Sequence, residues 1–194
     1  MINLISKNIV HFFVIQNTIK QEAEDIYRYG IELLVSTSTS LIASFLIACF
    51  FGKWYDFFVY YLLFLPIRMN AGGYHADTYG KCFLTTTSVF AVYILMLNTI
   101  SNLHIYIIIA SIILSILTIF MFAPVIHKNN IVTDTDIKKR RFISRFIIIT
   151  YSILAISLYI INANYRIINA IIYIIVLVSI SIIVNFLIER RENG

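Results

Sequence analysis

The 22 residues from Ile167 to Ile188, IINAIIYIIVLVSISIIVNFLI, contain no charged side chain. About 20 consecutive apolar residues in an α-helix cross the hydrocarbon core of a bilayer, so this stretch predicts a transmembrane helix. The whole chain has a similar character: 60% of its 194 residues are hydrophobic, only 13% are charged, and its mean hydropathy is +0.86. Soluble domains contain about 25% charged residues. The composition therefore excludes an ordinary soluble domain and indicates an integral membrane protein.

Six apolar segments follow the first 28 residues. They are Ile31–Phe51, Trp54–Ile67, Phe83–Ile100, Ile105–Ile126, Phe142–Ile161 and Ile167–Ile188. Five of them reach the roughly 17–25 residues that a transmembrane helix requires. The second has 14 residues, includes Asp56 and ends near Pro66, so it is either a tilted short span or a re-entrant arm.

These segments predict an all-α, polytopic membrane helix bundle with about six transmembrane segments. We expect one domain over residues 1–194, with the transmembrane bundle at 29–188 and a cytoplasmic tail at 189–194. Residues 2–28 place apolar side chains at helical spacing among polar ones, which is typical of an amphipathic helix. Its apolar run is too short to span a bilayer, so we expect residues 1–28 to lie at the membrane interface.

The basic residues indicate the orientation of the chain in the membrane. If both termini and the loops 68–82 and 127–141 face the cytoplasm, 13 of the 15 Lys and Arg residues lie inside, and only Lys53 and Arg166 lie outside. Cytoplasmic loops of membrane proteins carry such an excess of positive charge. The net charge of +5 therefore reports topology, and we expect contact with membrane lipid but not with nucleic acid.

A polar stretch with an arginine, a glycine pair, a histidine and a cysteine, RMNAGGYHADTYGKC, interrupts the apolar chain from Arg68 to Cys82. A cysteine thiolate is a strong nucleophile, and a neighbouring imidazole can take its proton and later return it to a leaving amine. His75 and Cys82 can form such a pair if the link between them is not helical. Gly72 and Gly73 suit positive φ angles there.

The same stretch also contains a predicted helix start. Asp77 or Thr78 can cap a helix that becomes apolar at Phe83. Cys82 would then lie near a helix N-terminus, where the partial positive charge favours a thiolate.

Arg68, the run GGYHA at 72–76 and Cys82 resemble the AgrB family of membrane cysteine peptidases. These enzymes process a pro-peptide, AgrD, in Gram-positive quorum sensing, and the resemblance covers essentially the whole chain. It implies that Cys82 and His75 cleave an AgrD-like pro-peptide before its C-terminal tail. An acyl-thioester on Cys82 would then be displaced by a thiol or hydroxyl of the peptide, which closes a ring. The resemblance also implies a homodimer.

Other residues of the polar stretch have two interpretations each. Arg68 can steady an oxyanion or hold a peptide carboxylate, or it can extend to lipid headgroups as an interfacial charge. Backbone N–H groups around Gly72 and Gly73 are rival oxyanion donors. Asn70 and Asp77 are candidates for orienting the imidazole.

A second basic stretch, Lys138-Lys139-Arg140-Arg141, is predicted to form a cytoplasmic rim. Topology and anionic lipid explain it, and the family resemblance adds capture of an acidic pro-peptide tail. Cys49 has no titratable neighbour in the sequence and is interpreted as a packing residue. The histidines other than His75 show no ligand spacing, so we expect neither a metal nor another cofactor.

Two hydroxyl-rich runs occur at 36–40 and 85–88. They indicate either close helix packing or the border of a hydrated chamber. Such a chamber would also suit the principal alternative function, a non-enzymatic small transporter or peptide exporter. A further alternative is a peptidase that hydrolyses its thioester with water and releases a linear product.

Overall fold

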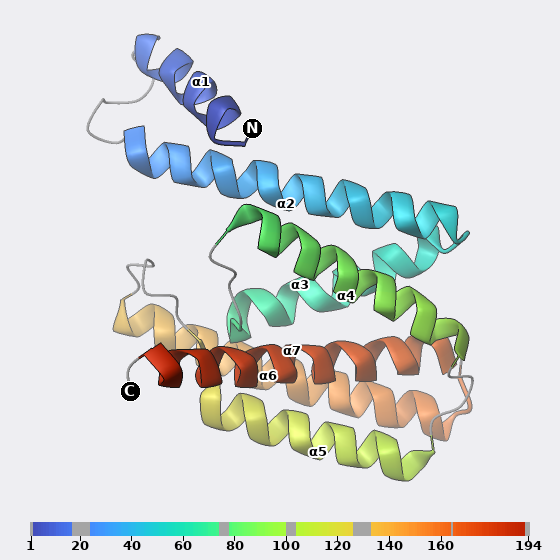
Figure 1. Ribbon diagram of the computed structural model, residues 1–194. Coiled ribbons are helices and arrows are strands. Elements are labelled where there is room, and N and C mark those ends of the chain that lie inside the picture. Colours follow the sequence, from blue (N-terminus) through green and yellow to red (C-terminus); the bar gives the residue numbers. More distant parts are fainter. Residues whose placement is uncertain are drawn as a thin grey trace. The chain divides into compact units, whose positions relative to one another are not determined.

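The computed structural model describes residues 2–16, 24–73, 78–99, 104–125, 133–163 and 165–192. Within these ranges the chain forms seven α-helices and no β-strand, as the sequence predicts (Figure 1). The helices are α1 (Ile2–Ile15), α2 (Glu24–Phe50), α3 (Trp54–Ala71), α4 (Tyr79–Thr99), α5 (Ile105–Phe122), α6 (Asp134–Ile160) and α7 (Tyr165–Glu192).

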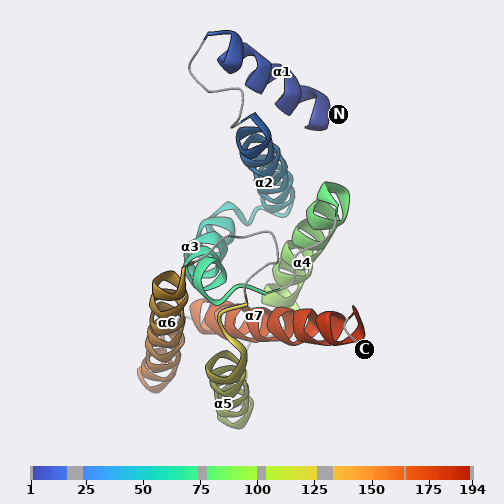
Figure 2. The ribbon, with the colours of Figure 1, turned by 90° about the vertical axis from the view of Figure 1, so that its left-hand side faces the viewer.

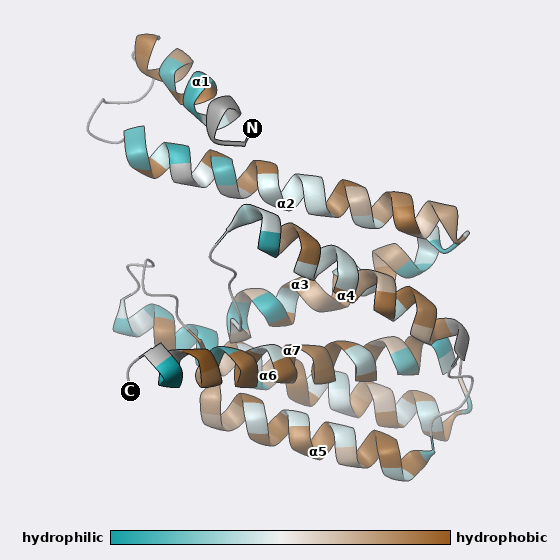
Figure 3. Ribbon diagram, in the orientation of Figure 1, coloured by the Kyte–Doolittle hydropathy of each residue, from teal (hydrophilic) through white to brown (hydrophobic). Residues whose placement is uncertain are grey.

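Five of the described helices, α2, α4, α5, α6 and α7, are long and apolar enough to cross a membrane. The other two are α1, which has only 14 residues, and α3, which contains Asp56 and Arg68 within 18 residues. Large apolar side chains also face outward, for example Phe50, Leu62 and Tyr106, which are 85%, 74% and 82% exposed. Extended apolar surface of this kind suits contact with lipid. The protein is thus a multi-pass membrane protein (Figure 3).

Several helix boundaries differ from those expected. The sequence predicts one interfacial helix over residues 2–28. In the structure α1 covers Ile2–Ile15, and residues 24–28 belong to the start of α2. The helix α3 continues through Pro66 to Ala71, so Arg68 lies in its last turn. The predicted segment Ile105–Ile126 is shorter in the structure, because Ala123 precedes Pro124 and has the extended backbone that proline favours in the residue before it.

The described chain forms two compact units. Unit 1 comprises Met1–Phe50 and Ala76–Ala91, and unit 2 comprises Phe51–His75 and Val92–Gly194, so α4 begins in the first unit and ends in the second. In unit 1, α1 packs on α2, and its side chains Ser6 and Val10 are fully buried.

Unit 2 is organised around α7, which packs against α3, α5 and α6. Figure 2 shows α7 crossing these helices at an angle. Fully buried α7 side chains such as Ile171, Ile175 and Val178 fill the contact. Within a bilayer, van der Waals packing of this kind stabilises helix association. It positions the C-terminal end of α3, where the polar stretch begins.

The ends of the helices in unit 2 separate the basic residues. The C-terminal ends of α3, α5 and α7 and the N-terminal end of α6 occupy one end of the unit (Figure 1). Lys53 precedes the first residue of α3 and Arg166 lies in the first turn of α7, so both belong to the opposite helix ends. Among the described residues, the cations at the first end are Arg68, Lys138, Lys139, Arg140, Arg141, Arg145, Arg190 and Arg191. This separation within unit 2 is the pattern that the charge count predicts.

Candidate active site

Cys82 lies in the first turn of α4, within unit 1. Its backbone N–H donates to the carbonyl of Thr78 at 3.0 Å, and the Thr78 hydroxyl accepts a hydrogen bond from the backbone N–H of Lys81 at 3.3 Å. Thr78 therefore caps the helix, as one of the two expected candidates. The Cys82 side chain is exposed, so a substrate or reagent can reach the sulfur. The predicted position of Cys82 near a helix N-terminus is confirmed.

His75, the other half of the predicted pair, lies outside the described residues, as does Asp77. The contact between His75 and Cys82 therefore stays a prediction. Asn70, the other candidate for orienting the imidazole, donates from Nδ2 to the carbonyl of Pro66 at 2.8 Å. This bond lies within its own helix.

Arg68 is half-buried in unit 2 and has partners within the protein. Its Nη1 donates to the carbonyl of Gly72 at 2.7 Å and to the hydroxyl of Ser181, on α7, at 3.0 Å. A guanidinium near a helix C-terminus commonly binds the last carbonyls in this way. Arg68 thus links the end of α3 to α7. The two hydrogen bonds offset the cost of partly burying its charge.

Gly72 and Gly73 have the positive φ angles expected of them, +76° and +130°. The N–H of Gly72 donates to the carbonyl of Arg68 at 3.1 Å and closes the helix, so this N–H is already engaged. A Cβ atom on Gly73 would overlap the Arg68 guanidinium and lie 2.6 Å from the Ser181 hydroxyl, and one on Gly72 would overlap the carbonyl of Val125. The glycine pair therefore lets the chain pass close to these groups.

The basic run Lys138–Arg141 lies in the first two turns of α6, not in a loop as expected. The helix starts early because the Thr133 hydroxyl accepts from the backbone N–H of Asp136 at 3.3 Å and caps it. Lys138, Lys139 and Arg141 are exposed, and Arg140 is partly exposed. Their charges are accessible to lipid headgroups or to an acidic peptide.

The hydroxyl-rich runs bond within their own helices. Thr39, Ser40 and Thr85 donate to the carbonyls of Val35, Ser36 and Lys81 at 2.7, 3.0 and 2.8 Å. Along α2, buried residues recur every fourth position. They are Glu32, Ser36, Ser40, Ser44 and Ala48. Small side chains at this spacing favour the helix-packing interpretation.

Glu32 is a buried residue that the sequence interpretation did not single out. It is only 9% exposed, and its carboxylate accepts hydrogen bonds from the hydroxyls of Ser6 at 2.9 Å and Tyr79 at 2.7 Å. Tyr79 is the first residue of α4, three positions before Cys82. An acidic residue inside an apolar segment was the available signal, because such residues are rarely placed there without a role.

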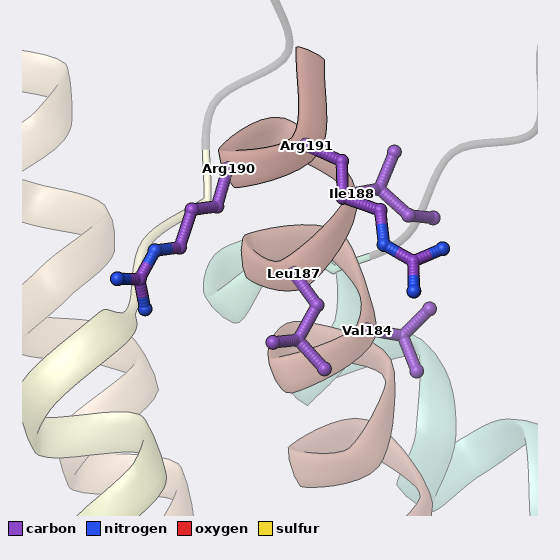
Figure 4. A pocket seen from close by; sticks show the side chains of 5 residues that line it. All are labelled: Val184, Leu187, Ile188, Arg190 and Arg191. Atoms are coloured by element: carbon purple, nitrogen blue, oxygen red, sulfur yellow. The ribbon is translucent and has the colours of Figure 1, made fainter. Parts of the chain in front are cut away.

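Two hollows in the described part of unit 2 contain none of the predicted site residues. One, of about 500 Å³, is lined by Val184, Leu187, Ile188, Arg190 and Arg191 at the end of α7. Figure 4 shows the two arginines extending to opposite sides of the helix. The arrangement is typical of a transmembrane helix end that meets lipid headgroups.

The second hollow, of about 200 Å³, lies among α4, α5 and α7. It is lined mainly by apolar and aromatic side chains, with Ser111 and Asn169 as polar members.

Cys49 is exposed and does not pack inside its unit, contrary to the interpretation from sequence. Its neighbours in α2 are apolar, so the exposed sulfur lies on an apolar surface of the kind that contacts lipid. Within the described ranges, no group of three or more His, Cys, Asp or Glu side chains is arranged to hold a metal ion.

The comparisons with known proteins agree with the resemblance seen in the sequence. A family model described as Accessory gene regulator B matches residues 1–182 of the 194-residue chain. Comparison with curated proteins and with solved structures found no match. The match extends from α1 to Ile182 in α7 and includes every candidate site residue predicted from the sequence.

Proposed function

The chain belongs to the accessory gene regulator B family, which acts in agr quorum sensing, and from this premise we propose that it is a cysteine endopeptidase. Its partner is an AgrD-like pro-peptide, as the family implies. The enzyme removes the C-terminal tail of this peptide and promotes closure of a thiolactone or lactone ring. The observation that carries the proposal is the exposed Cys82 thiol in the capped first turn of α4, seven residues after His75.

The proposed reaction has two acyl transfers. His75 takes the proton of Cys82, and the thiolate attacks the carbonyl carbon that precedes the tail. The bond to the tail nitrogen breaks, and His75 protonates the departing amine, which leaves an acyl-thioester on Cys82. A thiol or hydroxyl of the peptide then gives its proton to His75 and attacks the thioester. The ring closes, and Cys82 leaves as a thiolate.

Arg68, Gly72 and Gly73 support this chemistry chiefly by shaping the chain that leads to His75. The bonds from Arg68 to Gly72 and Ser181 anchor the end of α3, and the two glycines permit the tight exit from the helix. Backbone N–H groups of the following segment or of the start of α4 are the proposed oxyanion donors.

We place the active site and both termini on the cytoplasmic side of the cell membrane. In the described part of unit 2, all cations except Lys53 and Arg166 lie toward the helix ends that include Arg68, which supports this orientation under the positive-inside rule. The exposed run Lys138–Arg141 would attract the acidic tail of a pro-peptide and anionic lipid from that side. The proposed working form is a homodimer of single-domain chains.

The test is tail release in membranes that contain the protein and an AgrD-like pro-peptide. Cys82→Ser and His75→Ala should be expressed normally and release no tail, while the matched control Cys49→Ser should remain active. A wild-type yield from either site variant would refute the pair, and a transporter or exporter would tolerate Cys82→Ala. Mass spectrometry identifies the product, because the macrocycle is lighter than the hydrolysed linear peptide by one water.

A further inference from the structure

The mechanism leaves unused the buried carboxylate of Glu32, in the third turn of α2. A buried carboxylate is costly unless its oxygens are hydrogen-bonded. Here Oε1 accepts from Ser6 on α1 at 2.9 Å, and Oε2 accepts from Tyr79 on α4 at 2.7 Å. All three residues belong to unit 1. One carboxylate therefore joins three helices through two specific bonds.

The bond to Tyr79 bears directly on Cys82. Residues three positions apart lie on one face of a helix, separated by about 4.5 Å along its axis. The first turn is closed by the bond from the Cys82 N–H to Thr78 and by the Thr78 cap. A phenol held on Glu32 therefore fixes the position and rotation of the turn that carries the sulfur, relative to α2.

Apolar packing alone would fix the position and rotation of the first turn of α4 less precisely. A leucine at position 32 could fill the space between the helices without burying a charge, and such replacements are often neutral or stabilising. A carboxylate instead imposes direction, since each of its oxygens requires a hydroxyl at hydrogen-bond distance. This restricts both the rotation of α4 and the docking of α1.

The geometry points to Glu32 and Tyr79 as positioning residues for Cys82, with Ser6 linking the amphipathic helix α1 to the same carboxylate. This role rests on the proposed function insofar as Cys82 is the nucleophile. Displacement of α1 from α2 would free one carboxylate oxygen and loosen the start of α4. Docking of α1 is thereby coupled to the placement of the thiol.

Kinetics of tail release by the full-length protein in liposomes provide the first test. Tyr79→Phe should lower kcat about ten-fold with little change in KM, as expected for loss of a hydrogen bond to a charged group. Glu32→Leu removes both acceptor oxygens and should lower kcat at least as much. The double variant should be no slower than Glu32→Leu, because that change already removes the acceptor of the Tyr79 bond. Tyr27→Phe and Glu24→Leu, in the same unit, are matched controls and should behave as wild type.

A wild-type kcat for Tyr79→Phe, or a double variant whose loss is the product of the two single losses, would overturn the assignment. Ser6→Ala should also lower kcat, because it removes the second hydroxyl that binds the Glu32 carboxylate. A wild-type kcat in Ser6→Ala would remove Ser6 from the assignment.

A second measurement does not depend on activity. In a Cys49→Ser background, a nitroxide spin label on Cys82 should become more mobile in electron paramagnetic resonance spectra when Tyr79→Phe or Glu32→Leu is introduced, but not when Tyr27→Phe is introduced. Unchanged line shapes in Tyr79→Phe and Glu32→Leu would refute the positioning role. If Cys82→Ala still releases the tail, the proposed function fails. The spectra would still show whether Glu32 and Tyr79 hold the first turn of α4 in place.

Discussion

Replacement of Gly73 by alanine should destabilise the protein. Gly73 has φ +130°, a conformation that side chains rarely adopt. Its added Cβ would overlap the Arg68 guanidinium and approach the Ser181 hydroxyl to 2.6 Å. The change therefore strains the backbone and forces Arg68 away from at least one of its two partners.

The magnitude follows from these two effects. A residue held in such a backbone conformation costs about 1–3 kcal/mol. Loss of one hydrogen bond from the charged Arg68 side chain costs about 1.5–3 kcal/mol more. Gly73→Ala should thus lower the free energy of unfolding by about 2.5–6 kcal/mol. In an Arg68→Ala background only the backbone cost should remain, about 1–3 kcal/mol.

The assay is reversible unfolding in mixed detergent micelles, followed by loss of tertiary structure. Gly80→Ala is the matched control, because a Cβ at Gly80 meets nothing within 4 Å and alanine is the better helix former by about 1 kcal/mol. The two variants should therefore shift stability in opposite directions. Equal stability of Gly73→Ala and wild type, or an undiminished loss in the Arg68→Ala background, would refute the reasoning.

Three further predictions concern residues of unit 2. Tyr151→Phe removes the hydrogen bond of 2.9 Å from the Tyr151 hydroxyl to the carbonyl of Leu63. It should lower the free energy of unfolding by about 1 kcal/mol. No loss would show that this bond between α6 and α3 does not contribute to stability. Thr133→Ala removes the cap of α6 and should also cost about 1 kcal/mol, measured in the same way; full stability would mean that the cap contributes nothing. Glutamine at all four positions of Lys138–Arg141 should raise the KM for a pro-peptide with an acidic tail and weaken its dependence on salt, with kcat little changed. A KM and salt dependence like those of the wild type would exclude electrostatic capture by this run.

The helical membrane fold could be predicted because uncharged apolar runs such as Ile167–Ile188 have few other stable conformations in a bilayer. Helix ends were harder to predict. The end of α5 depends on Pro124, the start of α6 on the Thr133 cap, and α3 continues through Pro66 although proline lacks an N–H group. Each is a local effect that the hydrophobic pattern does not reveal.

For the candidate site, residue chemistry and spacing led to Cys82, and the helix start before it is confirmed. The partners of Arg68 could not be predicted, because Ser181 lies more than a hundred residues away along the chain and only the packing of α3 on α7 brings it close. The same holds for Glu32, whose partners Ser6 and Tyr79 belong to two other helices. Bonds between distant segments depend on how the helices pack, and no local pattern in the sequence reveals that packing.

The most direct test of the central claim is detection of an acyl-enzyme on Cys82. The protein, in liposomes, is incubated with an AgrD-like pro-peptide whose ring-closing residue is replaced by alanine, and the intact protein is then examined by mass spectrometry. The account predicts an adduct equal in mass to the peptide without its tail, mapped to Cys82, labile to hydroxylamine and present in Cys49→Ser. Tail release without this adduct, or the same adduct in Cys82→Ala, would contradict it.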